Sequence, residues 1–485
     1  MAQRSAPHPG RAWIRLLAFG LLIVPLLAAS ERRDDRPNIL FILLDDLGKE
    51  WISAYGAEDI RTPDIDALAA TGTRFENFYV MPQCTPTRLS FLTGQYPFRH
   101  GWVNHWDVPR WGGGAHYDWE RNPSIARVMK QAGYRTAVAG KWQINDFRVQ
   151  PEAMRDVGFD AYCMWTGSEG NNPQSDERYW GPYVHTKEGS ALRPGKFGDD
   201  LFVDFLIDFM RQNKDQPMFL YYAMCLPHSP FVATPAEPGV TTTLDKHKAM
   251  VRYADHLTGR LVKALDELGL RDNTIVVLTT DNGTAANITG ARHGRAVKGA
   301  KGQTSEAGVC APFIVNSPGR VPAGKVSPAL LTVADLLPTF AAIAGAEPDS
   351  SFVYDGKPAV AALLGQEDRS PHEWILAMGG GNHARLTNNG VENAYVYRDR
   401  VLRDERFKLY VDTQRRPSRL FDLRSDPWEE RNLIDSEDPE AVAALARLSQ
   451  PLATFPERDN DPLYTPLPPQ PWDVAVTAES EVWKK

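Results

Sequence analysis

Runs of apolar residues that stop abruptly at polar ones recur along most of this chain. The first run, residues 38–44, is almost wholly apolar and ends at Asp45-Asp46, a pattern typical of a strand buried on both faces of a sheet. Three later segments repeat this pattern. They span residues 135–139, 218–226 and 274–280, and the polar residues just beyond them are Lys141, His228 and Asp281-Asn282. The pattern therefore predicts four buried strands, each followed by charged or polar side chains.

Between these strands, apolar residues recur at helical spacing. The segments that show it are 62–70, 123–132, 199–212 and about 245–268. Alternating strands and helices predict an α/β fold, with a largely parallel, doubly wound central sheet and helices on both of its faces. Ligands of such open sheets bind at the C-terminal ends of the strands. We therefore expect the polar residues after the four strands to meet in one crevice.

From about residue 374 the pattern changes to short strands. The predicted strands are 393–398, 401–404, 407–411 and 419–423, followed by a helix at 439–449 and a proline-rich arm at 455–472. The length of 485 residues and the 42% hydrophobic content allow two domains with substantial cores. We predict a larger catalytic domain over residues 31–372. A smaller C-terminal domain with an antiparallel sheet is predicted over residues 373–485.

The N-terminus has the parts of a secretory signal. Arginines precede an apolar run from residue 16 to 29, and small residues stand before a cleavage point at Glu31. The run is too short for a comfortable membrane span. We therefore expect residues 1–30 to be a signal peptide that directs the chain to the export machinery. The protein would be periplasmic or secreted, without a stable membrane span; an uncleaved anchor is the alternative.

Charge and cysteine content narrow the class of protein further. A formal net charge of -7 argues against a general affinity for nucleic acid, so an anionic substrate would need a local basic cleft. The chain has four cysteines, too few for a disulfide-stapled scaffold. They are Cys84, Cys163, Cys225 and Cys310.

Two polar pairs, Asp45-Asp46 and Asp281-Asn282, offer only oxygen ligands. Such a set suits a hard cation such as Ca²⁺ or Mg²⁺ rather than zinc. Asp and Asn at strand ends are also common turn formers, which is the alternative interpretation. The two pairs lie on either side of a candidate nucleophile, Cys84, along the chain. This arrangement favours a metal site.

The segment from Cys84 to Gly94, Cys-Thr-Pro-Thr-Arg-Leu-Ser-Phe-Leu-Thr-Gly, contains the candidate nucleophile. Pro86 suits the first turn of a helix, which places Cys84 at a helix N-terminus that favours an anion. A lone Cys is usually a small buried hydrophobe, and Cys-x-Pro-x-Arg alone is common by chance. The longer match, which continues to Gly101, resembles the sequence in which sulfatases oxidise a cysteine to formylglycine.

This resemblance to formylglycine-dependent sulfatases of the alkaline phosphatase superfamily covers nearly the whole exported chain. The other segments that resemble the family are Arg36-Pro37-Asn38-Ile39-Leu40, Asp45-Asp46, Gly140-Lys141-Trp142, His228, Asp281-Asn282-Gly283, Lys301-Gly302 with Glu306, Gly308 and Pro312, and Leu420-Phe421-Asp422-Leu423 with Asp426-Pro427, Glu429 and Asn432-Leu433. The last group resembles the family's C-terminal domain.

The resemblance implies a cofactor and a modified residue. Asp45, Asp46, Asp281 and Asn282 would hold a divalent cation, commonly Ca²⁺ and less often Mg²⁺, together with an oxygen of modified Cys84. A formylglycine-generating enzyme would make that modification. The hydrated aldehyde offers one hydroxyl to attack sulfur and a second to expel the sulfate, whereas a thiol would end as a stable sulfur-linked ester. Conversion leaves three thiols, so at most one disulfide is possible.

The resemblance also implies roles for the cations. Arg88 would stabilise the hydrated aldehyde, and Lys141 and Lys301 would bind sulfate oxygens, with Lys298 as a nearby alternative to Lys301. His228 would protonate the leaving alcohol. A metal and three cations stabilise charge that develops on transferring oxygens.

The chain departs from the family pattern at two positions. Gln143 stands where many sulfatases have a histidine, and Gln is no general base, so it would only position a hydroxyl or contact substrate. The candidates to replace that histidine are His105, His185 and His293. The second departure is Cys310, at a position where relatives often carry an arginine.

We therefore predict a metal-dependent sulfatase that acts on a sulfated carbohydrate by covalent catalysis. A phosphate or phosphonate monoester hydrolase of the same superfamily is the closest alternative. A non-catalytic protein that binds sulfated glycans is a second alternative, suggested by Gln143. The aromatic segments 102–119 and 165–180 are candidates for a sugar-binding rim.

Overall fold

The computed structural model describes residues 36–102, 116–169, 172–379 and 396–465, shorter stretches at 384–387, 390–393, 467–468, 470–472 and 482–483, and residues 1, 3 and 6. Residues 34–485 form one compact unit, and residues 1–33 form another. Except for those three residues, the predicted signal peptide lies outside the described part, as does His105. Both the signal peptide and the domain boundary at residue 372 stay predictions. In the described part, no helix is long and apolar enough to cross a membrane.

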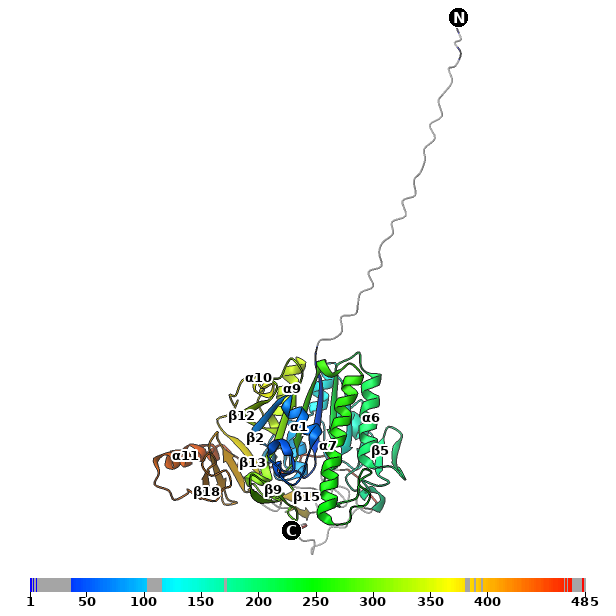
Figure 1. The fold of residues 1–485 in the computed structure, drawn as a ribbon. Coiled ribbons are helices and arrows are strands. Elements are labelled where there is room, and N and C mark those ends of the chain that lie inside the picture. Colours follow the sequence, from blue (N-terminus) through cyan, green and yellow to red (C-terminus); the bar gives the residue numbers. More distant parts are fainter. Residues whose placement is uncertain are drawn as a thin grey trace. The chain divides into compact units, whose positions relative to one another are not determined.

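The centre of the larger unit is a ten-stranded sheet with the order β12-β2-β11-β8-β1-β7-β3-β4-β5-β6 (Figure 1). Its strands are β1 (Asn38–Leu44), β2 (Thr73–Tyr79), β3 (Arg135–Lys141), β4 (Ala161–Trp165), β5 (Tyr183–Thr186), β6 (Gly189–Leu192), β7 (Met218–Ala223), β8 (Thr274–Thr280), β11 (Cys310–Asn316) and β12 (Lys325–Thr332). The block β8-β1-β7-β3-β4 is parallel. On one side of this block, β11 pairs antiparallel with β8. On the other side, β5 pairs antiparallel with β4, and β6 pairs antiparallel with β5. The predicted, largely parallel α/β sheet is confirmed.

Helices cover both faces of this sheet. One face carries α1 (Pro63–Ala70), α6 (Gly198–Gln212) and α7 (Thr243–Glu267), and the other carries α2 (Cys84–Thr93), α4 (Ile125–Gln131) and α9 (Leu336–Ala344). Alternate residues of β1 enter the two cores. Ile39, Phe41 and Leu43 pack with the α2 side, and Leu40, Ile42 and Leu44 pack with the α7 side. This division explains why a strand buried on both faces has no polar alternation.

The register of the parallel block aligns the ends of its strands. Leu44 of β1 pairs with Thr280 of β8, so Asp45 and Asp281 leave adjacent strands at the same level. The Asp281 N–H donates to the Leu44 carbonyl at 3.1 Å, and the Asp45 N–H donates to the Leu226 carbonyl at 2.9 Å. The predicted meeting of polar residues at the C-terminal edge follows directly from this pairing.

The C-terminal part forms a four-stranded antiparallel sheet, β13-β16-β17-β18. Its elements are β13 (Ile375–Met378), β16 (Arg400–Arg403), β17 (Phe407–Val411) and β18 (Pro417–Asp422), with α11 (Pro439–Ser449) following. Smaller sheets contain β9 (Thr289–Arg292) with β10 (Arg295–Lys298), and β14 (Ala384–Thr387) with β15 (Gly390–Asn393) and β19 (Val482–Trp483).

The strand predicted at 393–398 is wrong over residues 396–398, which form no strand, although its first residue, Asn393, is the last residue of β15. The buried carboxylate of Asp459 explains the difference. It accepts the Arg398 backbone N–H at 2.8 Å and pairs with the Arg400 guanidinium at 2.7 Å. A backbone donor that is bound to a side chain is not available to a strand ladder.

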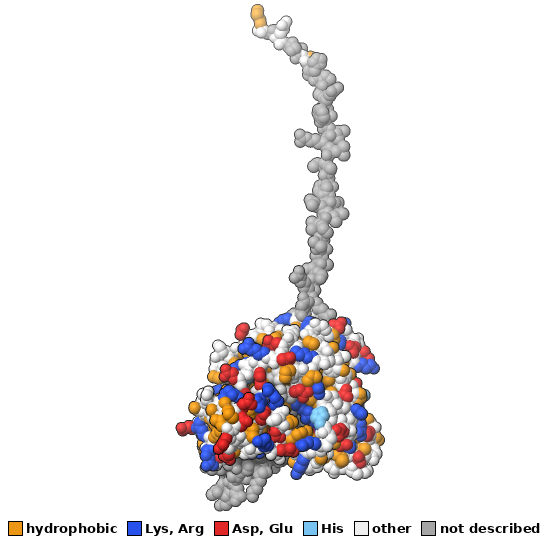
Figure 2. All heavy atoms as spheres, turned by 60° about the vertical axis from the view of Figure 1, so that its left-hand side comes forward, with side chains coloured by type: hydrophobic (Ala, Val, Ile, Leu, Met, Phe, Trp, Pro, Cys, Tyr) orange, Lys and Arg blue, Asp and Glu red, His pale blue; other side chains and the backbone are white. Residues whose placement is uncertain are grey.

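Basic and acidic side chains are intermingled on the surface that Figure 2 shows. This face lacks a broad patch of one sign, in keeping with the modest net charge of -7. A local basic cleft for an anionic substrate must therefore come from a few precisely positioned cations.

Candidate active site

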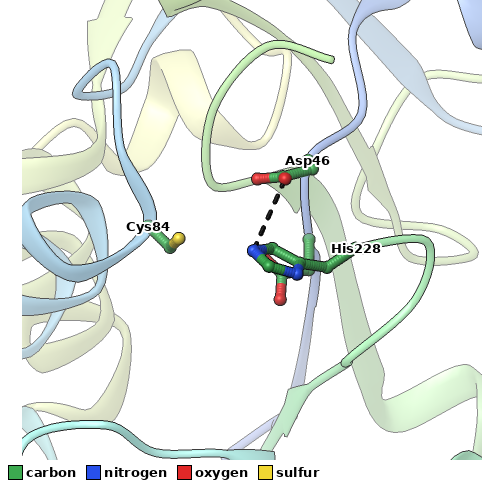
Figure 3. A group of neighbouring side chains, drawn as sticks. Asp46, Cys84 and His228 are labelled. Atoms are coloured by element: carbon green, nitrogen blue, oxygen red, sulfur yellow. Dashed lines mark ion pairs between the residues drawn. The ribbon is translucent and has the colours of Figure 1, made fainter. Parts of the chain in front are cut away.

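Cys84 is the first residue of α2 and is 6% exposed. The Thr87 hydroxyl, in the first turn of this helix, donates to the Asp281 carbonyl at 2.6 Å and fixes the helix start against β8. The Cys84 thiol points toward Asp46 and His228 (Figure 3). Burial raises the pKa of this thiol and outweighs the opposite effect of Lys141 and Lys301. The unmodified side chain is therefore a protonated thiol at neutral pH, which is a weak nucleophile.

The four predicted oxygen ligands lie together at the ends of β1 and β8. Asp45, Asp46, Asp281 and Asn282 are each at most 2% exposed. Asp281 Oδ1 accepts the Asp46 N–H at 3.1 Å, and Asn282 Nδ2 donates to Asp46 Oδ1 at 2.8 Å. Asp46 has a φ of 64°, a conformation that Asp adopts more readily than most residues. The turn after β1 therefore needs a residue of this type for its backbone as well as for its carboxylate.

Each of the three carboxylates has a cation of its own. Lys141 Nζ lies 2.6 Å from Asp45, Lys301 Nζ lies 2.7 Å from Asp46, and Arg88 Nη2 lies 2.7 Å from Asp281. The first and third of these pairs are buried, whereas Lys301 is partly exposed.

The pKa values in this cluster follow from burial and from the cations. Burial alone would raise the pKa of the Asp45 carboxyl, but Lys141 and the other cations outweigh it and hold the pKa below its ordinary value. The pKa of Asp46 is lowered in the same way, chiefly by Lys301. Burial and the charge of Asp45 raise the pKa of Asp281 to about 7. Asp45 and Asp46 are therefore ionised at neutral pH, and they border a space that favours positive charge.

These residues fit a bound divalent cation. Asp45 Oδ1 and Asn282 Oδ1 are buried and have no hydrogen-bond partner, although buried oxygens normally have one. One ligand atom from each of Asp45, Asp46, Cys84 and His228 lies within 4.8 Å of the others. Carboxylate and amide oxygens suit Ca²⁺ or Mg²⁺. A cation among them would satisfy both unpartnered oxygens.

His228 lies in the loop after β7, on the open side of the cluster. Its Nε2 is 3.0 Å from Lys301 Nζ and 3.6 Å from an Asp46 oxygen. Its Nδ1 is 3.0 Å from Arg178 Nη1, and the Tyr179 hydroxyl donates to the His228 carbonyl at 2.5 Å. Burial lowers the pKa of His228 to about 3, despite the opposing effect of Asp46. The imidazole is therefore neutral before an anion binds.

Of the other residues that the sequence singled out, Gln143 lies beside this cluster and His185 does not contact it. Gln143 lines a small cavity with Thr85, Arg88 and Lys141, and its Oε1 is buried without a partner. His185 stacks on Phe147 and bonds Ser190 and the Pro151 carbonyl, so it is part of the packing between β5 and its neighbours.

His293 and Lys298 are both exposed and lie in the β9–β10 hairpin. Lys301, rather than Lys298, reaches the acidic cluster. All four cysteines are free thiols, so the possible disulfide is not formed.

Two residues that contact the site or the residues near it were not predicted from the sequence. Arg178 contacts His228, but a single arginine in an aromatic segment gives no signal of that contact. Lys408 contacts Glu306 and Glu429 at 2.9 Å each, although only the two glutamates belong to segments that resemble the family. Both contacts join residues that are distant in sequence.

Comparison with known proteins agrees with this geometry. A family model described as Sulfatase matches residues 37–346. Arylsulfatase A of Bos taurus is 31% identical over 472 residues, which are 88% of this chain and 90% of that protein. N-acetylgalactosamine-6-sulfatase of Canis lupus familiaris is 31% identical over 360 residues, which are 68% of this chain but only 66% of that protein.

Solved structures share the fold. The crystal structure of Ps i-CgsB in complex with k-i-k-neocarrahexaose has a TM-score of 0.71 and 26% identity, covering 86% of this chain and 93% of that one. The phosphonate monoester hydrolase of Agrobacterium radiobacter has a TM-score of 0.62 and 21% identity, covering 86% and 96%. That second likeness shows the fold alone.

The central sheet, with a candidate nucleophile and clustered carboxylates at its C-terminal edge, defines an enzyme fold of the alkaline phosphatase superfamily. Within that superfamily the chain belongs to the sulfatase family, whose members are sulfuric ester hydrolases.

Proposed function

We propose that this protein hydrolyses sulfate esters on a carbohydrate, with formylglycine made from Cys84 as its nucleophile. The observation that supports this most is the position of Cys84 at the start of α2, within 4.8 Å of carboxylate oxygens of Asp45 and Asp46 and of the His228 ring. The chain would be exported through residues 1–30 and would need a formylglycine-generating enzyme.

The residues of the cluster supply distinct functions in this proposal. The α2 N-terminus and Lys141 bind the sulfate, because backbone N–H groups and a buried cation both favour an anion. Arg88 stays with Asp281 and orients the hydrated aldehyde of residue 84. His228 donates a proton to the leaving alcohol, since a sulfate beside it raises the pKa of the imidazole from its low value. Gln143 positions a hydroxyl but accepts no proton.

A divalent cation held by Asp45, Asp46, Asp281 and Asn282 would stabilise negative charge on the sulfate oxygens. We expect Ca²⁺ rather than Mg²⁺, because the resemblance to the family favours Ca²⁺ and because Ca²⁺ takes its ligands mainly from protein oxygens, whereas Mg²⁺ usually keeps several waters. Its binding would satisfy the unpartnered oxygens of Asp45 and Asn282.

Calcium should therefore stabilise the folded protein. At free Ca²⁺ about 100 times the Kd, the expected gain is about 2.7 kcal/mol in the free energy of unfolding. Asp45→Asn should lose most of this gain, whereas Asp368→Asn, which changes an exposed carboxylate, should keep it. Thermal unfolding of chelator-treated protein with added Ca²⁺ or Mg²⁺ measures the effect. Equal gains in both variants would contradict the proposed ligands.

The reaction type is tested with matched aryl sulfate, phosphate and phosphonate esters. We expect kcat/KM for the sulfate to exceed that for the phosphate by at least about tenfold, because the chain belongs to the sulfatase family and similar proteins are named as sulfatases. A preference for phosphate or phosphonate would reassign the protein to the alternative activity of the superfamily.

The substrate class is tested with a panel of sulfated mono-, oligo- and polysaccharides. The names of two similar proteins support a carbohydrate: one is an N-acetylgalactosamine-6-sulfatase, and the other was solved with a neocarrahexaose. Sulfate release, measured by ion chromatography on protein with converted Cys84, identifies the sugar. Binding without any release would support the glycan-binding alternative that Gln143 suggests.

A further inference from the structure

The open side of the candidate active site is the side of His228 and Lys301. Their side chains are 17% and 25% exposed, whereas those of Lys141 and Arg88 are 0% and 5% exposed. A sulfate bound against the buried cations therefore has its ester oxygen and alcohol portion on the side of His228. Groups next to the His228 ring are the ones that contact the rest of the substrate.

Arg178 is such a group, and its position is fixed. Its Nη1 lies 3.0 Å from His228 Nδ1, and its guanidinium stacks 3.9 Å from the ring centre of Trp165, the last residue of β4. The next residue, Tyr179, is buried and donates its hydroxyl to the carbonyls of Cys225 and His228. The segment that carries Arg178 is thus bound to the loop that carries His228.

The charge of Arg178 is not compensated in the described part of the chain. Arg88, Lys141 and Lys301 each pair with a carboxylate, but Arg178 has no acidic partner there, and its Nε is buried without a hydrogen bond. A divalent cation and a singly charged sulfate ester would leave the site positive, and Arg178 adds to that charge. A half-buried, uncompensated cation is unfavourable unless an anion binds beside it.

We propose that Arg178 forms a second anion subsite, and that the substrate is a sulfate ester whose alcohol portion carries another anionic group close to the ester. That group is a second sulfate or a carboxylate, both of which match the two-pronged donor geometry of guanidinium. This inference rests on the proposed sulfatase function and specifies its substrate class as a polyanionic glycan. Arg178 is then a specificity residue that contacts the substrate beside the leaving group.

The test compares charged aryl sulfates with neutral analogues. One pair is 2-carboxyphenyl sulfate and 2-carbamoylphenyl sulfate, and the other is catechol disulfate and 2-methoxyphenyl sulfate. The ratio of kcat/KM within each pair is measured for wild type, Arg178→Gln and Arg178→Lys, so that differences in leaving-group reactivity cancel between variants. Lys196→Gln, which removes an exposed cation nearby in sequence, is the control.

We expect Arg178→Gln to lower the charged-to-neutral ratio at least tenfold for one pair or both. Arg178→Lys should retain part of the preference, and Lys196→Gln all of it. The pair that responds identifies the second group as carboxylate or sulfate. An unchanged ratio in both pairs for folded Arg178→Gln, verified by its melting temperature, would overturn the proposal.

Binding separates this proposal from the sulfatase proposal. If wild type hydrolyses none of the four esters, the sulfatase function is in doubt, and the subsite is tested by calorimetry with Cys84→Ala protein. A charged-to-neutral affinity ratio that falls on Arg178→Gln supports the subsite. An unchanged ratio, or no binding of the charged esters, overturns it.

Discussion

Cys84→Ala should abolish sulfate release, with a loss of about 10⁴-fold or more in kcat, because it removes the atom that carries the nucleophile. The substitution removes one sulfur atom from a position that is 6% exposed, so its cost in folding free energy should be about 1 kcal/mol. Sulfate release and thermal unfolding, measured on the same preparations, separate the two effects.

Cys163→Ala is the matched control for this experiment. Cys163 is also a buried free thiol, 7% exposed, but lies in β4 away from the carboxylate cluster. We expect full activity and a similar small change in stability. Mass spectrometry should show the aldehyde at residue 84 in both wild type and this control. Sulfate release by folded Cys84→Ala would refute the assignment of the nucleophile.

Lys408→Met should lower the free energy of unfolding by about 3–5 kcal/mol. Lys408 of β17 is fully buried and lies 2.9 Å from both Glu306 and Glu429. The substitution removes the buried cation that the two carboxylates share, so that among the described residues Glu306 keeps only Arg403, at 3.9 Å, as a cationic partner. Chemical denaturation measures the loss, and Lys263→Met is the control, because its pair with Glu267 is exposed and such pairs contribute about 0–1 kcal/mol.

The same substitution should affect the active site. Glu306 begins α8 (Glu306–Val309), five residues after Lys301, and its N–H donates to Glu429 at 2.7 Å. The Tyr410 hydroxyl donates to the Thr304 carbonyl in the same segment. The C-terminal sheet thereby holds the loop that carries Lys301. We expect Lys408→Met to raise KM for sulfate esters more than Lys408→Arg does. Equal KM values in the two variants would show that Lys408 contributes to stability but does not position Lys301.

Acid should weaken this network in a defined range of pH. Burial raises the pKa of Glu306, but Lys408 and Arg403 outweigh burial and bring it to about 2, below the ordinary value of 4.5. A lowered pKa contributes stability that is complete above pH 4.5 and is lost as the pH falls toward 2. The difference in unfolding free energy between wild type and Glu306→Gln should therefore narrow over that range.

Cys310 and Gln143 are the two residues that depart from the family pattern, and the structure shows what surrounds each of them. Cys310 accepts a hydrogen bond from Lys49 Nζ at 3.1 Å. An arginine at this position would place a second positive charge beside Lys49, whereas the uncharged cysteine does not. Gln143 adopts a φ of 87°, which is rare for a residue with a side chain and indicates a backbone held by its surroundings. Its amide oxygen is buried without a hydrogen-bond partner, and the residue lines the same small cavity as Arg88 and Lys141.

The sequence alone determined the parts of this protein that depend on local pattern. The ranges 38–44, 274–280, 407–411 and 439–449 match β1, β8, β17 and α11, because a continuous apolar run or helical spacing specifies one element by itself. The helix start at Cys84 was predicted from Pro86, which suits a first helical turn, and the polar residues at strand ends were predicted from the points where the apolar runs stop. The family resemblance then selected candidate residues that the structure brings to one edge of the sheet.

Tertiary structure alone decided what depends on distant partners. It set the positions of β11, β5 and β6 beside the parallel block, the replacement of part of a predicted strand by contacts with Asp459, and the choice of Lys301 over Lys298. It also brought Arg178 to His228 and Lys408 to Glu306. These contacts join residues 40 or more positions apart, and hydrophobic periodicity contains no information on which charged side chains will meet across such separations.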